Sequence, residues 1–109
     1  MFSDIKSLGL TGLESYMVDV ELNIAEGKYS MDIVGLPDTA VNEAKERVVA
    51  AIRNSGFSLN YTSHYTFNLA PADTRKEGSL YDLPLAVAIL SATMQIRGNY
   101  KKAAFIGEL

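Results

Sequence analysis

The most informative segment of the sequence reads YTFNLAPAD at residues 65–73, TRKEGS at residues 74–79 and LYDLPLAV at residues 80–87. Apolar and polar residues alternate from Tyr65 to Leu69, which is the period of a half-buried strand. Pro71 ends this strand, because proline has no backbone N–H to donate to a neighbouring strand. The segment therefore predicts a strand followed by a charged loop and a further element.

That further element is predicted to be a buried helix. Apolar residues after position 80 fall on every side of a helix that continues to about Met94, and such a helix is buried on more than one side. Asp82 or Ser79 is expected to cap it, and Pro84 suits its first turn. At about 12 residues it is too short to cross a membrane, which takes about 20 residues.

Three more strands are predicted before this segment. Residues 4–10 form a weak first strand, and a clean alternation from Ser15 to Ile24 indicates a long amphipathic second one. The alternation resumes from Tyr29 to Ile33, after a turn at Glu26-Gly27. Because the loop is so short, we expect the second and third strands to pair with each other as an antiparallel hairpin.

A helix from about Thr39 to Ser55 is predicted between the third and fourth strands. Asp38 suits its N-cap position and Gly56 its end. Arg47 lies on the polar face. One apolar stripe of the helix is expected to face the core, and it contains Val41, Ala44, Val48, Ala51 and Ile52.

A last strand is predicted at residues 103–109, which gives the order β-β-β-α-β-α-β. Two helices of this order cover one face of a mixed sheet, so the predicted fold is an α+β two-layer sandwich. Because the sequence stops inside the last predicted strand, we expect the chain to be a fragment of a longer protein.

Composition narrows the class of protein. The chain has 109 residues, of which 48% are hydrophobic, and this suits one domain with a modest core. It has no cysteine, and its N-terminus has no apolar stretch typical of a signal peptide, so a cytoplasmic protein is expected. The net charge of −3 excludes a protein whose whole surface attracts nucleic acid. A local basic patch is still compatible with this charge.

Catalytic and metal-binding patterns are weak. His64 is the single histidine, and Ser63 beside it cannot be its partner on a strand, because successive side chains point to opposite faces. His64 is therefore interpreted as a strand-edge or core residue. The acids Asp73, Glu77 and Asp82 could together hold a hard cation, but helix capping and pairing with nearby cations are favoured, so no metal site is predicted.

The loop at residues 74–79 is the best candidate for binding an anion. Arg75 and Lys76 precede Gly78 and Ser79, where a helix start is expected to offer free N–H groups. These four residues are the candidate contacts to phosphate or DNA. The competing interpretation, a solvated loop with an Arg–Glu pair, is favoured by composition alone. Tyr65 and Phe67 are expected to pack in the core rather than to stack on bases.

Several longer motifs resemble one family. They are IVGLPDTAV at 33–41, ERV at 46–48, RNSGF at 53–57, NLAPAD at 68–73, KEGS at 76–79 and YDLP at 81–84. In this order the motifs resemble the N-terminal domain of the ComM/YifB proteins, the magnesium-chelatase-like AAA+ ATPases of bacteria. The resemblance covers essentially the whole chain. It implies that residues 1–109 are one such domain, with the ATPase module after them.

The resemblance implies a function that the residues themselves do not show. Members of the family carry Walker motifs after this domain, bind ATP and Mg²⁺ there, and assemble into hexameric rings in the cytoplasm. ComM proteins are DNA helicases that drive branch migration during natural transformation. The domain itself is then expected to be non-catalytic, with no cofactor of its own, and to contribute DNA contact and ring assembly.

A more distant resemblance links the domain to the proteolytic domain of the Lon proteases and the C-terminal domain of RadA. All share the fold of the second domain of a small-subunit ribosomal protein. The serine of the Lon Ser–Lys dyad falls on Leu80, and leucine cannot be a nucleophile. Two alternatives remain open: a Lon-type serine peptidase that uses a displaced Ser79, and a purely structural assembly collar.

Overall fold

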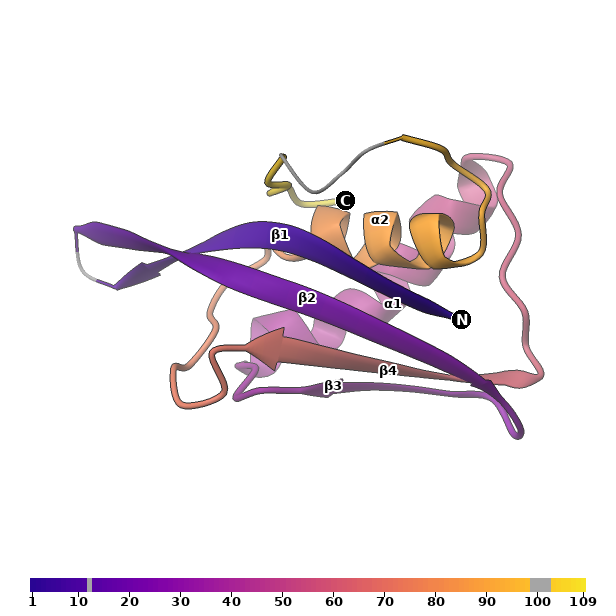
Figure 1. Ribbon diagram of the computed structural model, residues 1–109, viewed down its shortest axis with the longest axis horizontal. Helices are drawn as coiled ribbons and strands as arrows, with labels where there is room; N and C mark the ends of the chain where they lie inside the picture. The colour runs from indigo at the N-terminus through magenta and orange to yellow at the C-terminus, as the bar shows by residue number, and fades with distance from the viewer. Residues whose placement is uncertain (12, 99–102) are drawn as a thin grey trace.

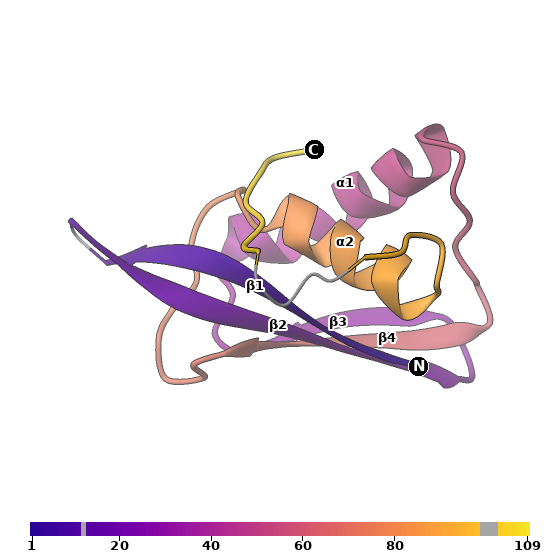
Figure 2. The ribbon, with the colours of Figure 1, turned by 45° about the horizontal axis from the view of Figure 1, so that its top comes forward.

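The computed structural model describes residues 1–11, 13–98 and 103–109, and in them it forms one mixed sheet with two helices. The α+β class is confirmed. Both helices cover the same face of the sheet (Figures 1 and 2). The elements are β1 (Phe2–Thr11), β2 (Glu14–Glu26), β3 (Ser30–Val34), α1 (Thr39–Asn54), β4 (Ser63–Ala70) and α2 (Asp82–Ala92).

The strand order is β1-β2-β4-β3, so β4 lies between β2 and β3. β4 pairs antiparallel with β2, where Leu69 lies opposite Val20, and parallel with β3, where Tyr65 lies opposite Met31. The predicted hairpin between the second and third strands is therefore wrong. Tyr65, Phe67 and Leu69 are at most 2% exposed, and a strand this deeply buried is stabilised best by a neighbour on each side.

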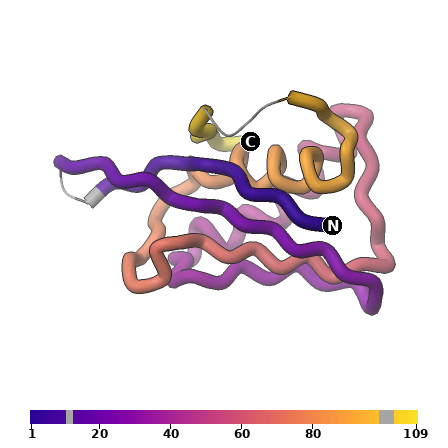
Figure 3. Tube along the Cα trace, viewed as in Figure 1, coloured from indigo at the N-terminus to yellow at the C-terminus, as the bar shows by residue number. Residues whose placement is uncertain are grey.

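The β1–β2 pair is longer than the rest of the sheet. In Figures 1 and 3 these two strands run together past the end of β4 and project from the body of the molecule. The first strand is confirmed and extends beyond its predicted ends. Several apolar side chains are exposed on the projecting part, namely Leu8, Leu10, Leu13 and Met17.

α1 begins and faces the core as its sequence predicts. Asp38 is its N-cap, and the Asp38 carboxylate accepts a hydrogen bond of 2.8 Å from the Val41 amide. The apolar stripe is buried at Val41, Ala44, Val48 and Ile52, whereas Ala51 is only half-buried. This helix covers the sheet on the β3 and β4 side (Figure 2).

α2 is buried on several sides, as predicted, but its start differs from the prediction. The N-cap position belongs to Tyr81, and no side chain caps the helix there. Asp82 is fully buried in the first turn, where it bonds to α1 instead of capping its own helix. No helix within the described residues is long and apolar enough to cross a membrane.

Residues 103–109 do not form the predicted strand. An isolated parallel bridge joins Ala104 to Lys6 at the edge of β1. The segment then bonds to the start of α2, because Gly107 donates to the Leu80 carbonyl at 2.8 Å and accepts from the Leu83 amide at 2.9 Å. The segment therefore makes one backbone bond to β1, from the Phe105 amide to the Lys6 carbonyl, and two bonds around the start of α2, instead of a ladder along the sheet.

Candidate functional site

Two of the motifs meet in space at one end of the sheet. The turn at residues 35–38 lies against the loop at residues 71–79, which we call the 71–79 loop. Lys76 donates its amide to the Leu36 carbonyl, and its own carbonyl accepts from the Asp38 amide, both at 2.9 Å. This is a short parallel bridge between Pro37 and Lys76, and it continues the parallel direction of β3 and β4.

Gly35 lets the turn approach β4 closely. Its φ is +113°, and a Cβ at this position would lie 2.1 Å from the Leu69 carbonyl oxygen. Only glycine fits such a contact between two backbones. Leu36 also has a positive φ, of 57°, which is unfavourable for a residue with a Cβ, so the backbone of this turn is strained.

Asp38 connects the start of α1 to the 71–79 loop. One carboxylate oxygen caps α1, and the other accepts the Gly78 amide at 3.1 Å. Gly78 has a φ of +88°, a conformation that glycine adopts without the penalty a Cβ carries. The carboxylate therefore fixes the loop and the helix in one relative position.

Lys76 is not on the surface, and this corrects its predicted role. Its side chain is fully buried, and its ammonium donates to the Pro71 carbonyl oxygen. Burial lowers the pKa of Lys76, although nearby Asp73 opposes the shift. A buried ammonium of this kind holds the loop closed and is not available to a phosphate.

Three of the amides around the predicted helix start already have partners. Gly78 donates to Asp38, Asp82 donates to the Ser79 carbonyl at 3.3 Å, and Leu83 donates to Gly107. Position 84 is proline, which has no N–H. The helix start therefore offers no anion-binding cluster of these amides.

Arg75 is the predicted contact that remains accessible. Its side chain is 62% exposed and lies 3.8 Å from the Glu77 carboxylate. Its carbonyl accepts a hydrogen bond of 3.4 Å from the Tyr16 hydroxyl of β2. The Arg–Glu pair of the competing interpretation is thus present. Ser79 is half-buried, and the contact of Arg75 with phosphate stays a prediction.

The three acids considered for a cation do not come together. Asp82 is fully buried and bonded to Arg47, while Asp73 and Glu77 are exposed. Within residues 1–11, 13–98 and 103–109, no group of His, Cys, Asp or Glu is placed to hold a metal ion.

The Arg47–Asp82 pair is a partly buried polar contact that the sequence did not predict. Arg47 Nε donates to Asp82 Oδ2 at 2.7 Å, and its second donor reaches Asp82 Oδ1 at 3.0 Å. Arg47 also bonds to the Ala40 carbonyl, and the Leu109 amide donates to Asp82 at 3.1 Å. The hydrogen bond to Asp82 raises the pKa of Arg47, and burial opposes this shift. The partners lie 35 residues apart, so no local spacing could have indicated the pair.

His64 has a partner that sequence reasoning missed. Its Nδ1 hydrogen-bonds the Ser30 hydroxyl across the parallel β3–β4 pair. His64 is therefore neither at a sheet edge nor in the core, because β4 has a neighbour on each side and the His64 side chain lies on its exposed face. In the described part of the chain, no carboxylate hydrogen-bonds to this histidine to complete a triad.

Comparison with known proteins identifies the family. A family described as subunit ChlI of Mg-chelatase matches residues 20–109. The chain belongs to this family. It is 43% identical to the uncharacterized protein YifB of Escherichia coli and of Salmonella typhimurium, and 39% identical to the competence protein ComM of Haemophilus influenzae, each over 90% of the chain. The predicted ComM/YifB type is confirmed. The chain spans 19% of the length of each of these relatives.

Residues 1–11, 13–98 and 103–109 of this ChlI-family chain show no lysine bonded to the serine that the peptidase alternative would use. Leu80, the residue onto which the distant resemblance places the Lon serine, is exposed. Lys76 is the lysine nearest in sequence to Ser79, and its ammonium bonds to Pro71. Among the described residues, no lysine or histidine hydrogen-bonds to the Ser79 hydroxyl.

Proposed function

We propose that this chain is a non-catalytic N-terminal domain of a ComM/YifB-type AAA+ ATPase. In the full-length protein it contributes DNA contact and ring assembly, while a separate module binds ATP and Mg²⁺ and drives DNA branch migration in the cytoplasm. The observation that carries the proposal is the 39–43% identity to ComM and YifB over 90% of the chain. ComM is named a competence protein, which supports a role connected with DNA.

The geometry of the 71–79 loop supports DNA contact through Arg75. Asp38 and the buried Lys76 fix the loop, so the exposed Arg75 is presented on a backbone that needs little ordering. Its pair with Glu77 is exposed, and exposed pairs contribute at most about 1 kcal/mol. A phosphate can therefore replace Glu77 at little cost.

The projecting β1–β2 hairpin supports the assembly part of the proposal. Leu10 is 71% exposed and Leu13 is fully exposed, and Met17 lies near them on the same hairpin. Apolar side chains that gather on one projecting element are typical of a surface that a partner covers. The proposed partner is a neighbouring subunit of a hexameric ring.

The test is DNA binding by the full-length protein across a range of salt concentrations, measured by fluorescence anisotropy. Arg75→Ala is expected to weaken binding and to reduce the slope of log K against log salt by about 0.7–0.9, the value for one lost phosphate contact. Arg97→Ala is the matched control, because Arg97 is exposed elsewhere on the domain. Equal slopes for Arg75→Ala and the wild type would remove Arg75 from the interface.

Two rival functions predict different results. A Lon-type peptidase with Ser79 as its nucleophile predicts cleavage of fluorescent casein by the full-length protein, and loss of that cleavage in Ser79→Ala. A purely structural collar predicts normal ring assembly together with DNA binding that no exposed residue of this domain affects. Serine-dependent cleavage would overturn the non-catalytic proposal.

A further inference from the structure

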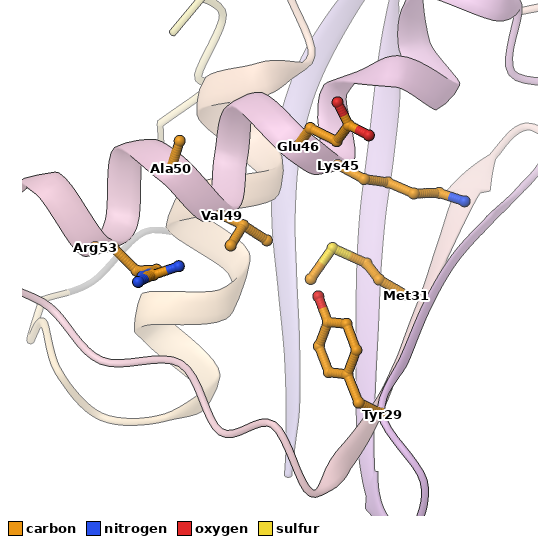
Figure 4. Close-up of a pocket in the computed structure, with 7 residues that line it drawn as sticks. All are labelled: Tyr29, Met31, Lys45, Glu46, Val49, Ala50 and Arg53. Carbon is orange, nitrogen blue, oxygen red and sulfur yellow. The ribbon is translucent and has the colours of Figure 1, made fainter.

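A groove lies between α1 and the start of β3 with the residue before it (Figure 4). Its volume is about 460 Å³, within the range of ordinary binding pockets. Tyr29 and Met31 line one side, and Val49 and Ala50 of α1 line the other. Figure 4 shows Met31 and Val49 pointing toward each other, with the Tyr29 hydroxyl directed toward the helix. The floor of the groove is therefore apolar.

The groove runs beside a sheet edge that no other strand occupies. β3 is the last strand of the sheet order, and in the described structure it pairs with β4 alone. Figure 1 shows β3 at the border of the sheet with no segment alongside it. The N–H and C=O groups on its outer side can pair with an added strand. An open strand edge beside an apolar groove is the arrangement that binds an extended peptide.

Two cationic residues of α1 line the helical side of the groove. Lys45, Val49 and Arg53 fall at i, i+4 and i+8, so Lys45 and Arg53 are separated by about 12 Å along the helix axis. Neither cation takes part in an ion pair among the described residues. The Glu46 carboxylate points away from Met31 and Tyr29 in Figure 4.

The spacing of the two cations matches an extended chain. Residues that are four apart in a strand lie about 13 Å from each other and point to the same face. Two acidic residues at this separation would meet Lys45 and Arg53. The residue midway between them would point into the apolar floor next to Val49.

We propose that this groove binds an extended peptide segment with the pattern acidic-x-apolar-x-acidic, which adds to the outer edge of β3. The main chain of the peptide pairs with β3, its central apolar side chain enters the groove, and its two carboxylates meet Lys45 and Arg53. This site is separate from the 71–79 loop and does not depend on the function proposed for it.

A peptide fits the groove better than a single-stranded nucleic acid does. The Tyr29 ring already packs against Tyr61 at 5.3 Å and Tyr65 at 6.1 Å between centroids, so its faces are partly covered. The lining between Lys45 and Arg53 includes no other cation, so the phosphates of a continuous chain that fall between these two residues would meet no positive charge. A strand with two carboxylates four residues apart places its charges only at the two cations.

The experiment is an NMR titration of the ¹⁵N-labelled 109-residue chain with the acetylated, amidated peptide Thr-Asp-Thr-Ile-Thr-Asp-Thr. We expect saturable shifts in the amides of residues 30–34 and of the middle of α1. The spectrum also shows directly whether each variant is folded. Absence of saturable shifts in these residues at millimolar peptide would overturn the proposal. Stronger shifts of the same amides by an oligo-dT would make the groove a nucleic-acid surface instead.

Charge variants test the alignment of the peptide. Arg53→Glu is expected to weaken binding of the acidic peptide about three- to tenfold, whereas Arg97→Glu makes the same change in net charge and leaves binding intact. The double variant Lys45→Glu/Arg53→Glu should instead prefer Thr-Lys-Thr-Ile-Thr-Lys-Thr over the acidic peptide. Equal weakening by Arg53→Glu and Arg97→Glu, or a double variant that keeps its preference for the acidic peptide, would contradict the proposed site.

Discussion

Arg47 of α1 and Asp82 of α2 form a two-bond contact, with Nε 2.7 Å from Oδ2 and the second donor 3.0 Å from Oδ1. Their exposure is unequal, because the Asp82 side chain is fully buried while the Arg47 side chain is 30% exposed. Asp82 also accepts the Leu109 amide. One carboxylate therefore connects both helices and the segment at residues 103–109.

The unequal exposure predicts unequal effects of removing each partner. Arg47→Met leaves a buried carboxylate without its cation, so the melting temperature is expected to fall by roughly 10 °C. Asp82→Ala leaves Arg47 without its partner, but water can reach the guanidinium. The fall in melting temperature that the lost ion pair causes is therefore expected to be smaller. Thermal unfolding followed by circular dichroism measures both.

The matched control for this prediction is Arg53→Met on the same helix. Arg53 lies in the last turn of α1 and has no ion pair among the described residues. Its replacement should change the melting temperature by only a degree or two. If Arg47→Met and Arg53→Met had equal effects, the Arg47–Asp82 contact would not stabilise the packing of the helices.

Gly35 provides a second prediction about stability. The effect of its close contact with β4 can be separated by experiment from the effect of its positive φ. Gly35→Ala adds a Cβ that lies 2.1 Å from the Leu69 carbonyl oxygen, at a φ of +113°. A positive φ alone costs about 1–2 kcal/mol for a residue with a Cβ. Because the backbone of β4 must also move, we expect a total loss of more than about 3 kcal/mol in the free energy of unfolding. Urea denaturation measures this loss.

Gly56→Ala is the control for the conformational part. Gly56 also has a positive φ, of 84°, but a Cβ there would meet nothing within 4 Å. The expected loss is about 1 kcal/mol. Similar losses at the two glycines would show that β4 shifts easily and that the close contact of the turn is unimportant.

Local patterns in the sequence predicted the elements well because their causes are local. The alternation around Phe67 reflects the two faces of one strand, and the Asp38 cap involves an amide only three residues away. The stripe of α1 likewise depends only on the helical period. These features follow from the geometry of one segment and need no knowledge of its neighbours.

The incorrect predictions concern contacts between distant segments. The order of the strands depends on β4 entering between β2 and β3, and a short loop favours the hairpin when β4 is ignored. Lys76 looks like a surface cation, but the turn at residues 35–38, from a distant part of the chain, pairs with its backbone, and its side chain is buried inside the loop. Arg47 lies on the polar face of α1, and its partner arrives only when α2 packs beside it. Of the two predicted cations, the structure leaves only Arg75 accessible.

The buried Lys76 leads to a prediction about pH. Burial places the pKa of Lys76 in the folded protein below the ordinary lysine value of 10.5, which also applies to the unfolded chain. Between these two values the unfolded chain binds more protons than the folded protein, so the contribution of Lys76 makes stability rise with pH. Its destabilising effect is fully present at pH values below the lowered pKa.

Lys76→Met isolates this contribution, because methionine occupies a similar volume and carries no charge. We expect the free energy of unfolding of the wild type, minus that of Lys76→Met, to increase as pH rises through the alkaline window that ends near 10.5. The buried hydroxyls of Tyr65 and Tyr81 have raised pKa values, and they oppose this trend above their ordinary pKa. Both proteins contain these tyrosines, so their effect cancels in the difference. Urea titrations at a series of pH values give the two free energies, and a difference that stays flat or falls would place the Lys76 ammonium in water rather than against Pro71.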